Sequence, residues 1–179
     1  THHVQEFFEY VFERLDLSRD IHFYTNTTID TLDYSGTGLN TGSKVVVAAY
    51  GDVKRTLSRE VPTCLQQLNG FGPAHLAMPG VVCLQLQSYT NAAATDLAIA
   101  SLNAQLQNNL NELNGIVQII LCDDAHFTAL NMGNYLWVTY TRCNPSHDIH
   151  GIGAFVEHKH WGCYGPMMID ARIKPHHAP

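Results

Sequence analysis

The chain has 179 residues, of which 45% are hydrophobic, so it is long enough for one globular domain with a substantial core and cramped for two. Its formal net charge is -6, and its 10 Lys and Arg residues are spread along the chain without forming a basic stretch. We therefore expect neither nucleic acid nor anionic lipid as the main partner, and the apolar runs at residues 81–86 and 115–122 are too short for membrane insertion.

The N-terminal part predicts one helix followed by an irregular arm. Residues 4–17 carry apolar side chains at intervals of three and four, the pattern of an amphipathic helix with one apolar stripe. The stripe comprises Val4, Phe7, Phe8, Val11, Phe12 and Leu15. Residues 25–36 mix turn-forming and β-branched residues, so we expect an extended arm or loop there.

The middle of the chain predicts alternating strands and helices. Residues 44–50 and 81–89 are β-branched or apolar and predict strands, whereas residues 56–68 favour a helix. Loops are expected at residues 69–73 and 78–80, because both contain Gly and Pro. Residues 91–114 favour a long helix, whose apolar spacing is set by Leu97, Leu102, Leu106, Leu110 and Leu113.

An apolar strand is predicted over residues 116–121, and it ends at the acidic pair Asp123 and Asp124. The order strand, long helix, strand is that of a crossover unit in a parallel sheet, and strands that are apolar throughout fit burial on both faces. We therefore predict a single α/β domain of three layers, with a mostly parallel or mixed sheet flanked by helices.

The last third of the chain predicts a short buried helix that contains Leu136, Trp137, Val138 and Tyr140. Asn144-Pro145 ends it, because proline lacks the donor that a helix needs and disfavours helical backbone in the preceding residue. Thr141 and Arg142 then lie at the C-terminus of the helix. A cation there can cap free carbonyls, so a structural role for Arg142 stands beside a functional one.

Asp123 and Asp124 are candidates for a ligand-binding loop. They follow the carboxyl end of a predicted parallel strand, where loops of open α/β sheets converge on a crevice. The alternative is that one of them caps a following helical turn.

Histidines are the candidates for a metal site. His158 and His160 lie on one face if the segment is extended, and His147 and His150 lie upstream. Zinc sites normally add a third ligand at regular spacing, and none is evident here, so we predict no metal site and a structural or solvent-facing role for these histidines.

The five cysteines are odd in number and widely spaced: Cys64, Cys83, Cys122, Cys143 and Cys163. They form no CxxC pair, which argues against a cysteine-based zinc site and favours reduced, buried thiols in the cytoplasm. Cys143 and Cys163 are candidate nucleophiles, but neither lies in a motif that lowers a thiol pKa, apart from the neighbouring Arg142.

Several motifs together resemble the C-terminal half of the UbiD family of decarboxylases. They are residues 27–34 and 42–46, the pair Asp123-Asp124, Leu136-Trp137 with residues 141–145, Asp148, Trp161-Gly162, Gly165-Pro166 and Ile169-Asp170. The resemblance covers residues 25–179, which we take as a UbiD-like C-terminal domain, preceded at residues 1–24 by the amphipathic helix and its connection.

The resemblance implies a part of a carboxy-lyase that decarboxylates aromatic or α,β-unsaturated acids with prenylated FMN and a divalent metal. In that family the cofactor and the catalytic Glu-Arg-Glu/Asp set belong to an N-terminal domain, and this chain matches neither. The chain is therefore expected to have no catalytic residue, to bind no cofactor alone, and to supply an oligomer interface and one wall of the substrate crevice. Thr141, Arg142 and Trp161 are the expected crevice residues, because they flank the Pro145 break and the turn at residues 162–166.

The first residue is not Met, and the termini are ragged, so we expect a fragment that works with the N-terminal catalytic domain of the same enzyme and forms homo-oligomers, dimers or higher. Two alternatives remain: an independent small-molecule or metal-binding α/β protein, and an accessory subunit of a decarboxylase.

Overall fold

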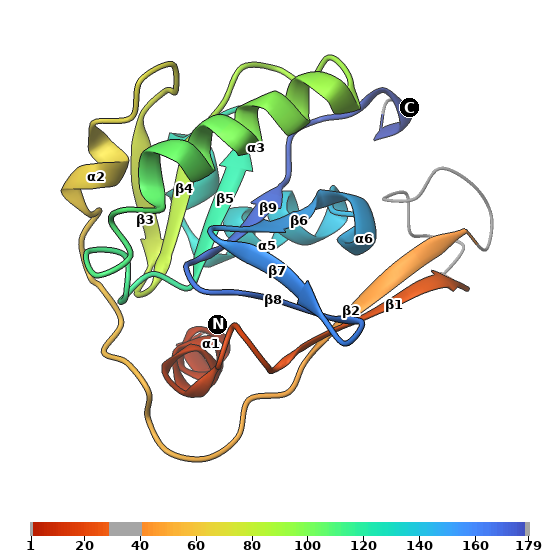
Figure 1. Ribbon diagram of the computed structural model, residues 1–179. Helices are drawn as coiled ribbons and strands as arrows, with labels where there is room; N and C mark the ends of the chain where they lie inside the picture. The colour runs from red at the N-terminus through yellow and green to blue at the C-terminus, as the bar shows by residue number, and fades with distance from the viewer. Residues whose placement is uncertain (1, 29–40, 178–179) are drawn as a thin grey trace.

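The computed structural model describes residues 2–28 and 41–177 (Figure 1). Its elements in the N-terminal half are α1 (His2–Arg14), β1 (Ile21–Thr27), β2 (Gly42–Val47), α2 (Thr63–Gln66), β3 (Ala74–Met78), β4 (Val81–Gln85) and α3 (Ala92–Leu106). Those in the C-terminal half are β5 (Gln118–Cys122), α4 (Ala125–Ala129), α5 (Met132–Thr141), α6 (Pro145–Asp148), β6 (Ile149–Gly151), β7 (Ala154–Glu157), β8 (His160–Cys163), β9 (Met167–Asp170) and the 3-10 turn η1 (Pro175–His177).

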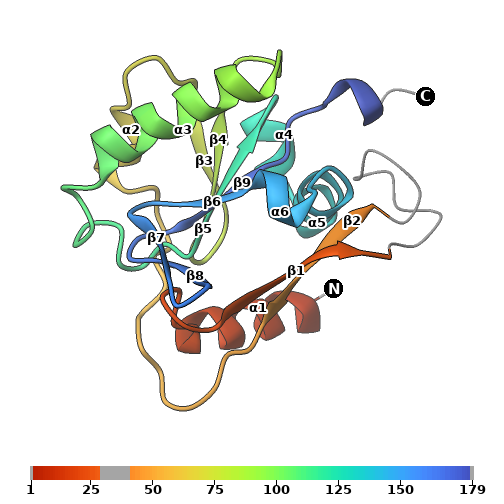
Figure 2. The ribbon, with the colours of Figure 1, turned by 45° about the vertical axis from the view of Figure 1, so that its right-hand side comes forward.

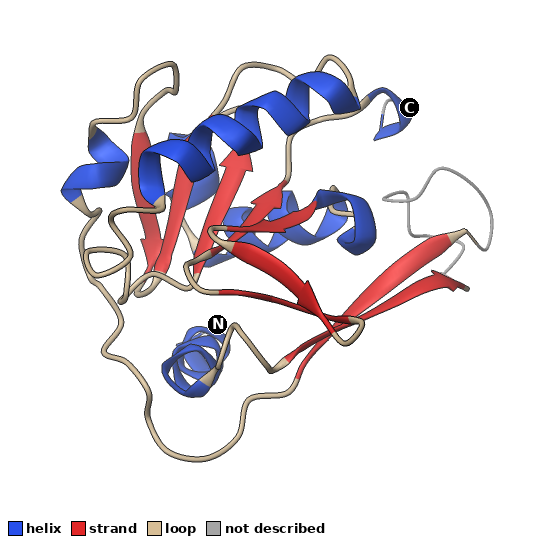
Figure 3. Cartoon of the chain, in the orientation of Figure 1, coloured by secondary structure: helices blue, strands red, loops and turns tan. Residues whose placement is uncertain are grey.

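A mixed sheet of five strands organises the fold, in the order β3-β4-β5-β9-β6 (Figure 3). The three central strands are parallel, and β3 and β6 run antiparallel to them at the edges. Cys83 pairs with Ile120, which in turn pairs with Ile169. Two antiparallel ribbons, β1-β2 and β7-β8, lie outside this sheet.

The apolar side chains of the central strands alternate between two cores, one on each face of the sheet. Val82 and Leu84 pack into the core that includes Leu102 of α3. Val81 and Cys83 face the core that includes residues of α1 and α5. Figures 1 and 2 show α3 on one side of the sheet and α1 and α5 on the other. The predicted three-layer α/β fold is confirmed.

Most of the predicted elements are present. The first helix, the strands near residues 44–50, 81–89 and 116–121, the long helix and the helix before Pro145 appear as α1, β2, β4, β5, α3 and α5. The parallel pairing of β4 with β5 across α3 confirms the crossover unit. Of the predicted arm at residues 25–36, the first part belongs to β1 and residues 29–36 lie outside the described residues.

The helix predicted over residues 56–68 is wrong except for α2. The backbone of Ser58 bonds elsewhere: its N–H donates to the Gly115 carbonyl at 2.9 Å, and its carbonyl accepts from Gly80 at 2.9 Å. Pro62 then supplies no N–H donor, so the helix begins only after it. These bonds lie between residues distant in sequence, which local patterns do not reveal.

The long helix ends at Leu106 rather than at Asn114. Asn109 follows its end, and the Asn109 side chain donates to the Gln105 carbonyl at 3.0 Å, a contact that competes with the regular helix. The predicted stripe is also incomplete, because Leu102 and Leu106 are buried while Leu97 is 74% exposed.

Three further findings concern the histidines, membrane-spanning helices and the cysteines. His158 and Lys159 have φ angles of 50° and 68° and form the turn between β7 and β8, so the segment of His158 and His160 is not one extended strand.

Among residues 2–28 and 41–177, no helix is long and apolar enough to cross a membrane. Four of the five cysteines are buried, and within the described part of the chain none of the five forms a disulfide.

Leu102→Ala is expected to lower the free energy of unfolding by about 2–5 kcal/mol, because it leaves a cavity between α3 and the sheet. The exposed Leu97 of the same helix provides the control, and Leu97→Ala is expected to change stability by less than about 0.5 kcal/mol. Urea denaturation followed by circular dichroism measures both. Equal losses for the two variants would contradict the packing of α3 described above.

Candidate functional site

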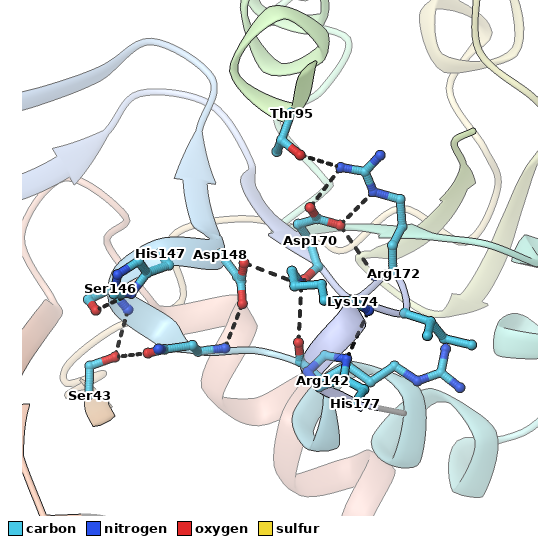
Figure 4. A network of polar contacts seen from close by, with 12 residues as sticks. Ser43, Thr95, Arg142, Ser146, His147, Asp148, Asp170, Arg172, Lys174 and His177 are labelled. Atoms are coloured by element: carbon cyan, nitrogen blue, oxygen red, sulfur yellow. Dashed lines mark hydrogen bonds and ion pairs between the residues drawn. The ribbon is translucent and has the colours of Figure 1, made fainter. Parts of the chain in front are cut away.

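A group of buried charged side chains lies where β9 ends at the carboxyl edge of the parallel strands. Side chains alternate along β9, so Asp170 lies on the same face as Met168, the face covered by α3. The chain then continues through Arg172 and Lys174, both only 5% exposed. We call Asp148, Asp170, Arg172 and Lys174 the charge network (Figure 4).

Asp170 and Arg172 form a bidentate ion pair at the centre of the network. Arg172 Nε donates to Asp170 Oδ1 and Nη2 donates to Oδ2, both at 2.8 Å. The remaining donors of Arg172 reach the Gln87 carbonyl at 3.0 Å and Thr95 Oγ1 at 2.8 Å. Asp170 has no solvent exposure, so these bonds replace its hydration. The pair thereby joins the end of β9 to the first turn of α3.

Lys174 joins three other segments. Its ammonium lies 3.3 Å from Asp148 Oδ1 of α6 and donates to the Asp170 carbonyl at 2.9 Å and the Arg142 carbonyl at 3.2 Å. An ammonium has three donors, and each of these contacts can use one. Figure 4 shows Lys174 between α6, β9 and the end of α5.

Asp148 extends the network to β2. Its Oδ2 accepts a 2.7 Å hydrogen bond from the Asn144 backbone. The Asn144 side chain accepts from Ser43 Oγ at 2.5 Å, and Ser43 Oγ in turn accepts from the Ser146 backbone at 2.8 Å. The N-terminal end of the short helix α6 is therefore anchored to Ser43, about a hundred positions away in sequence.

The two carboxylates differ in how well their charge is compensated. Burial favours the neutral form of Asp170, but the hydrogen bonds and charges of Arg172 and the charge of Lys174 outweigh burial and lower its pKa. For Asp148, burial outweighs the attraction of Lys174 and the pKa is raised. The negative charge of Asp170 is thus well compensated by its positively charged neighbours, whereas the charge of Asp148 is compensated less fully.

A cavity of about 340 Å³ adjoins the network. Its lining includes Tyr89 after β4, Asp96 of α3, His150 of β6 and three members of the network, Asp148, Asp170 and Lys174. His150 Nε2 is buried and has no hydrogen-bond partner among the described residues, and burial lowers the pKa of this ring. Five separate segments therefore converge on one hollow.

The two predicted ligand-loop residues are largely engaged with the protein. Asp124 is the N-cap of α4, where its Oδ1 accepts from Phe127 N at 2.9 Å, as the capping alternative expects. Asp123 Oδ2 accepts from Ile173 N at 2.8 Å and lies 3.7 Å from Arg142 Nη1. The structure thus brings Asp123 and Arg142 together beside the charge network.

The three predicted crevice residues fall in two places. Arg142 is the C-cap of α5, and the Thr141 hydroxyl donates to the Trp137 carbonyl at 2.6 Å, so both lie at the helix end that Lys174 contacts. Trp161 lies on β8, where its ring packs edge-on against Phe23 at 5.3 Å between centroids. Arg142 and Thr141 therefore share a location, and Trp161 belongs to a different part of the molecule.

The candidate metal and thiol residues are also dispersed. His158 lies in the β7–β8 turn, and His160 Nε2 is 3.1 Å from the Ser18 carbonyl. Within the described part of the chain, no group of three or more His, Cys, Asp or Glu is placed to hold a metal ion. Cys143 and Cys163 are buried, and burial raises the pKa of Cys163 to about 12.

Sequence reasoning missed Lys174 and Arg172, and it considered His150 only as one of the histidines upstream of a possible metal site. One local signal was present: Asp170, Arg172 and Lys174 are charged residues at every second position, beginning directly after the apolar residues 167–169. Spacing of that kind places charges on one face if the chain stays extended. The partners Thr95 and Gln87 come from distant segments and carry no such signal.

The chain resembles known proteins along most of its length. Residues 1–49 match the family described as 3-octaprenyl-4-hydroxybenzoate carboxy-lyase C-terminal domain, UbiD_C. A Chlamydia pneumoniae protein, named as a subunit of 4-hydroxybenzoate decarboxylase, is 31% identical over 172 residues, which cover 93% of this chain and 26% of the relative. Uncharacterized proteins of Chlamydia caviae and Chlamydia muridarum are each 28% identical, over 98% and 93% of this chain and 29% and 27% of their own lengths. The chain thus spans little more than a quarter of these relatives.

Asp170→Asn is expected to lower the free energy of unfolding by about 3–5 kcal/mol at neutral pH, because Arg172 stays buried without its counter-charge. The folded pKa of Asp170 is lowered, so its ionisation stabilises the fold above the unfolded pKa of about 3.9, and this contribution is lost as the pH falls through the folded value. The acid dependence of stability should therefore be shallower in the variant. Chemical denaturation between neutral pH and pH 3 measures both effects.

Asp124→Asn is the matched control, because asparagine serves as well as aspartate at an N-cap, and we expect a change below about 0.5 kcal/mol. If Asp170→Asn were as mild as this control, the network would contribute little to the fold.

Proposed function

We propose, from the relation of this chain to the C-terminal domain of the UbiD family, that it serves as the C-terminal domain of a decarboxylase of aromatic or α,β-unsaturated carboxylic acids. The carrying observation is the 31% identity, over 93% of the chain, to a protein named as a subunit of 4-hydroxybenzoate decarboxylase. Because the chain spans about a quarter of that relative, catalysis is assigned to the part of the enzyme outside it.

The chemistry of the charge network supports this division. Both carboxylate oxygens of Asp170 accept hydrogen bonds from Arg172. Lys174 forms an ion pair with Asp148 and donates hydrogen bonds to two backbone carbonyls. Groups held in this way stabilise the domain and are not free to transfer protons to a substrate. We therefore assign a structural role to the network and expect the chain alone to be inactive.

Arg142, with Thr141 beside it, is the best-supported part of the proposed crevice wall. Its guanidinium is partly exposed and paired with Asp123 at the carboxyl end of β5, an edge where α/β sheets form ligand sites. Lys174 holds the Arg142 carbonyl, which fixes the end of α5. We propose that the Asp123–Arg142 pair faces the substrate crevice in the full enzyme. Trp161 and Asp124 remain weaker candidates, because one packs on Phe23 and the other caps α4.

The cofactor of the full enzyme is proposed to be prenylated FMN with a divalent metal, which supply the decarboxylation chemistry when bound. The described residues of this chain do not fit that group: the two buried carboxylates of the charge network are already paired with Arg172 and Lys174. We therefore assign its binding to the N-terminal catalytic domain.

A second candidate is an accessory subunit that assembles with a separate catalytic chain, which the word subunit in the name of the Chlamydia pneumoniae relative favours. The reading frame upstream of Thr1 distinguishes it from a domain of one polypeptide. The metal-binding alternative has lost its main support, because His158 and His160 belong to a hairpin rather than to one strand face.

The proposed function is tested by reconstitution. The chain is mixed with the N-terminal part of a UbiD decarboxylase, prenylated FMN and Mn²⁺, and carbon dioxide release is measured from 4-hydroxybenzoate and a panel of unsaturated acids. We expect release only when both parts are present, and Arg142→Ala should lower kcat/KM by about tenfold, as for loss of one charged contact. Lys54→Ala, at an exposed site, is the control and should have no effect.

Two results would contradict the proposal. One is flavin retained at unit stoichiometry by the chain alone after gel filtration. The other is an Arg142→Ala enzyme with full kcat/KM and only a lower melting temperature, which would make Arg142 a helix-end cap.

Self-association is proposed to involve α1. Phe12 and Leu15 are buried against the core, and Phe8 stacks on Tyr140 at 6.4 Å between centroids, so one end of the stripe docks on its own domain. Phe7 remains 62% exposed on the same helix. Homodimer cores are rich in such aromatic residues, and isologous dimers are the commonest closed assembly.

Sedimentation at micromolar concentration tests the dimer. We expect the mass of the wild-type chain to rise with concentration and Phe7→Gln to shift the equilibrium toward monomer by about tenfold, because an aromatic anchor is lost. Leu97→Gln on α3 removes another exposed apolar side chain and should leave the equilibrium unchanged. A monomer at every concentration would remove self-association from the proposal.

A further inference from the structure

The tripeptide Leu-Asn-Gly occurs twice in this chain, in two different structural settings. One copy is Leu68-Asn69-Gly70 in the loop between α2 and β3, and the other is residues 113–115 between α3 and β5 (Figure 1). Asparagine followed by glycine is prone to deamidation, because glycine has no side chain to hinder the approach of its backbone nitrogen to the asparagine side chain. Since the two tripeptides are identical, a difference in their reactivity in the folded protein has to come from the fold.

Deamidation at such a site is a ring closure followed by hydrolysis. The backbone nitrogen of the glycine gives up its proton and attacks the side-chain carbonyl carbon of the asparagine. The bond between that carbon and the amide nitrogen breaks, and the amide leaves with the proton as ammonia. Water then opens the succinimide ring at either of its two carbonyls, which gives aspartate or isoaspartate. Both products carry one additional negative charge, and water is the only co-reactant.

Asn69 and Gly70 present the reacting groups without competing bonds. Both residues are exposed. Within the part of the chain that the structure describes, neither the Asn69 side-chain amide nor the Gly70 N–H forms a hydrogen bond. A Cβ atom placed on Gly70 would meet none of the described residues within 4 Å, and its φ of 84° is one that glycine adopts at little cost. The side chain and the following peptide are therefore free to rotate toward each other.

Gly115 is in a more restrained setting. Its carbonyl accepts a 2.9 Å hydrogen bond from Ser58 N. A Cβ atom placed on it would lie 2.8 Å from Ser58 N and 3.0 Å from the Thr56 carbonyl oxygen, and Ile116, directly after it, is buried. Ring closure at Asn114 therefore has to break this hydrogen bond or displace the neighbouring segment.

The loop at Asn69 is tied down on both sides of the reacting peptide. Asn69 exchanges two backbone hydrogen bonds with the Gln105 side chain of α3, at 2.9 and 3.2 Å. Gly72 N donates to the Gln85 carbonyl of β4 at 2.8 Å, and Phe71 packs against the core beneath α3. Isoaspartate adds one methylene group to the main chain between these anchors. The longer chain must therefore displace Phe71 or break one of the anchoring hydrogen bonds.

We propose that Asn69 is a site of spontaneous deamidation, and that its conversion to isoaspartate loosens the α2–β3 loop from α3. Asn114, in the same tripeptide, is protected by the packing of Gly115. This inference concerns the chemistry of the 179-residue chain and does not depend on the proposed role in a decarboxylase.

Peptide mapping of the folded chain during incubation at mildly alkaline pH tests the proposal. Cleavage after glutamate separates the two sites, because Glu60 and Glu112 flank Asn69, whereas Glu112 and Glu157 flank Asn114. Fragment spectra locate the modified residue, and methylation by a protein isoaspartyl methyltransferase identifies isoaspartate. We expect Asn69 to react about tenfold faster than Asn114, because the hydrogen bond lost at Gly115 raises the barrier to ring closure there.

The urea-unfolded chain is the matched control, because the fold no longer distinguishes the two tripeptides, and Asn69 and Asn114 should then react at similar rates. Asn69→Asp reproduces the new charge without lengthening the main chain, so its melting temperature should stay close to that of the wild type. The isoaspartyl form, separated by chromatography, should melt about 2–4 °C lower, the shift for loss of about one anchoring hydrogen bond.

Three results would overturn the proposal. Equal rates at Asn69 and Asn114 in the folded chain would show that the fold does not select between them. A preference for Asn69 that persists unchanged in urea would assign it to sequence beyond the tripeptide rather than to the fold. An isoaspartyl form that melts at the wild-type temperature would reject the loosening of the α2–β3 loop.

Discussion

The burial of Asp170 opposite Arg172 is the constraint on which the C-terminal half of this structure depends. A carboxylate without solvent exposure is tolerated only if charge and hydrogen bonds replace its hydration, and here Arg172 supplies both. Arg172 can do so only if Gln87 and Thr95 take up its other donors. One buried charge therefore fixes the position of the segment after β4, the start of α3 and the chain beyond β9.

Lys174 links the end of β9 to the opposite side of the site. It connects β9 to Asp148 of α6 and to the carbonyl of Arg142 at the end of α5. The Asp123–Arg142 pair is thus positioned by a network whose charged groups are already paired or hydrogen-bonded within the protein. This arrangement is consistent with the proposed wall of a site that another part of an enzyme completes.

Local patterns predicted the parts of the fold that depend on local chemistry. The apolar runs of β4 and β5, the start of α3 after Asn91 and the break at Pro145 each depend on a few neighbouring residues, and each was found where it was predicted. Residues 56–62 and the charge network depend on contacts between distant segments, such as Ser58 with Gly115 and Arg172 with Thr95. The sequence pattern therefore placed Arg142 and Asp123 at element ends and missed the side chains that hold them.

A double-mutant cycle on Asp170 and Arg172 tests the central claim most directly. The free energies of unfolding of Asp170→Asn, Arg172→Met and the double variant give the coupling between the two side chains without the contributions of their separate contacts. The structure predicts a favourable coupling of about 2–3 kcal/mol, with the double variant more stable than the sum of the single losses implies. Additive losses would contradict the claim that this pair organises the site.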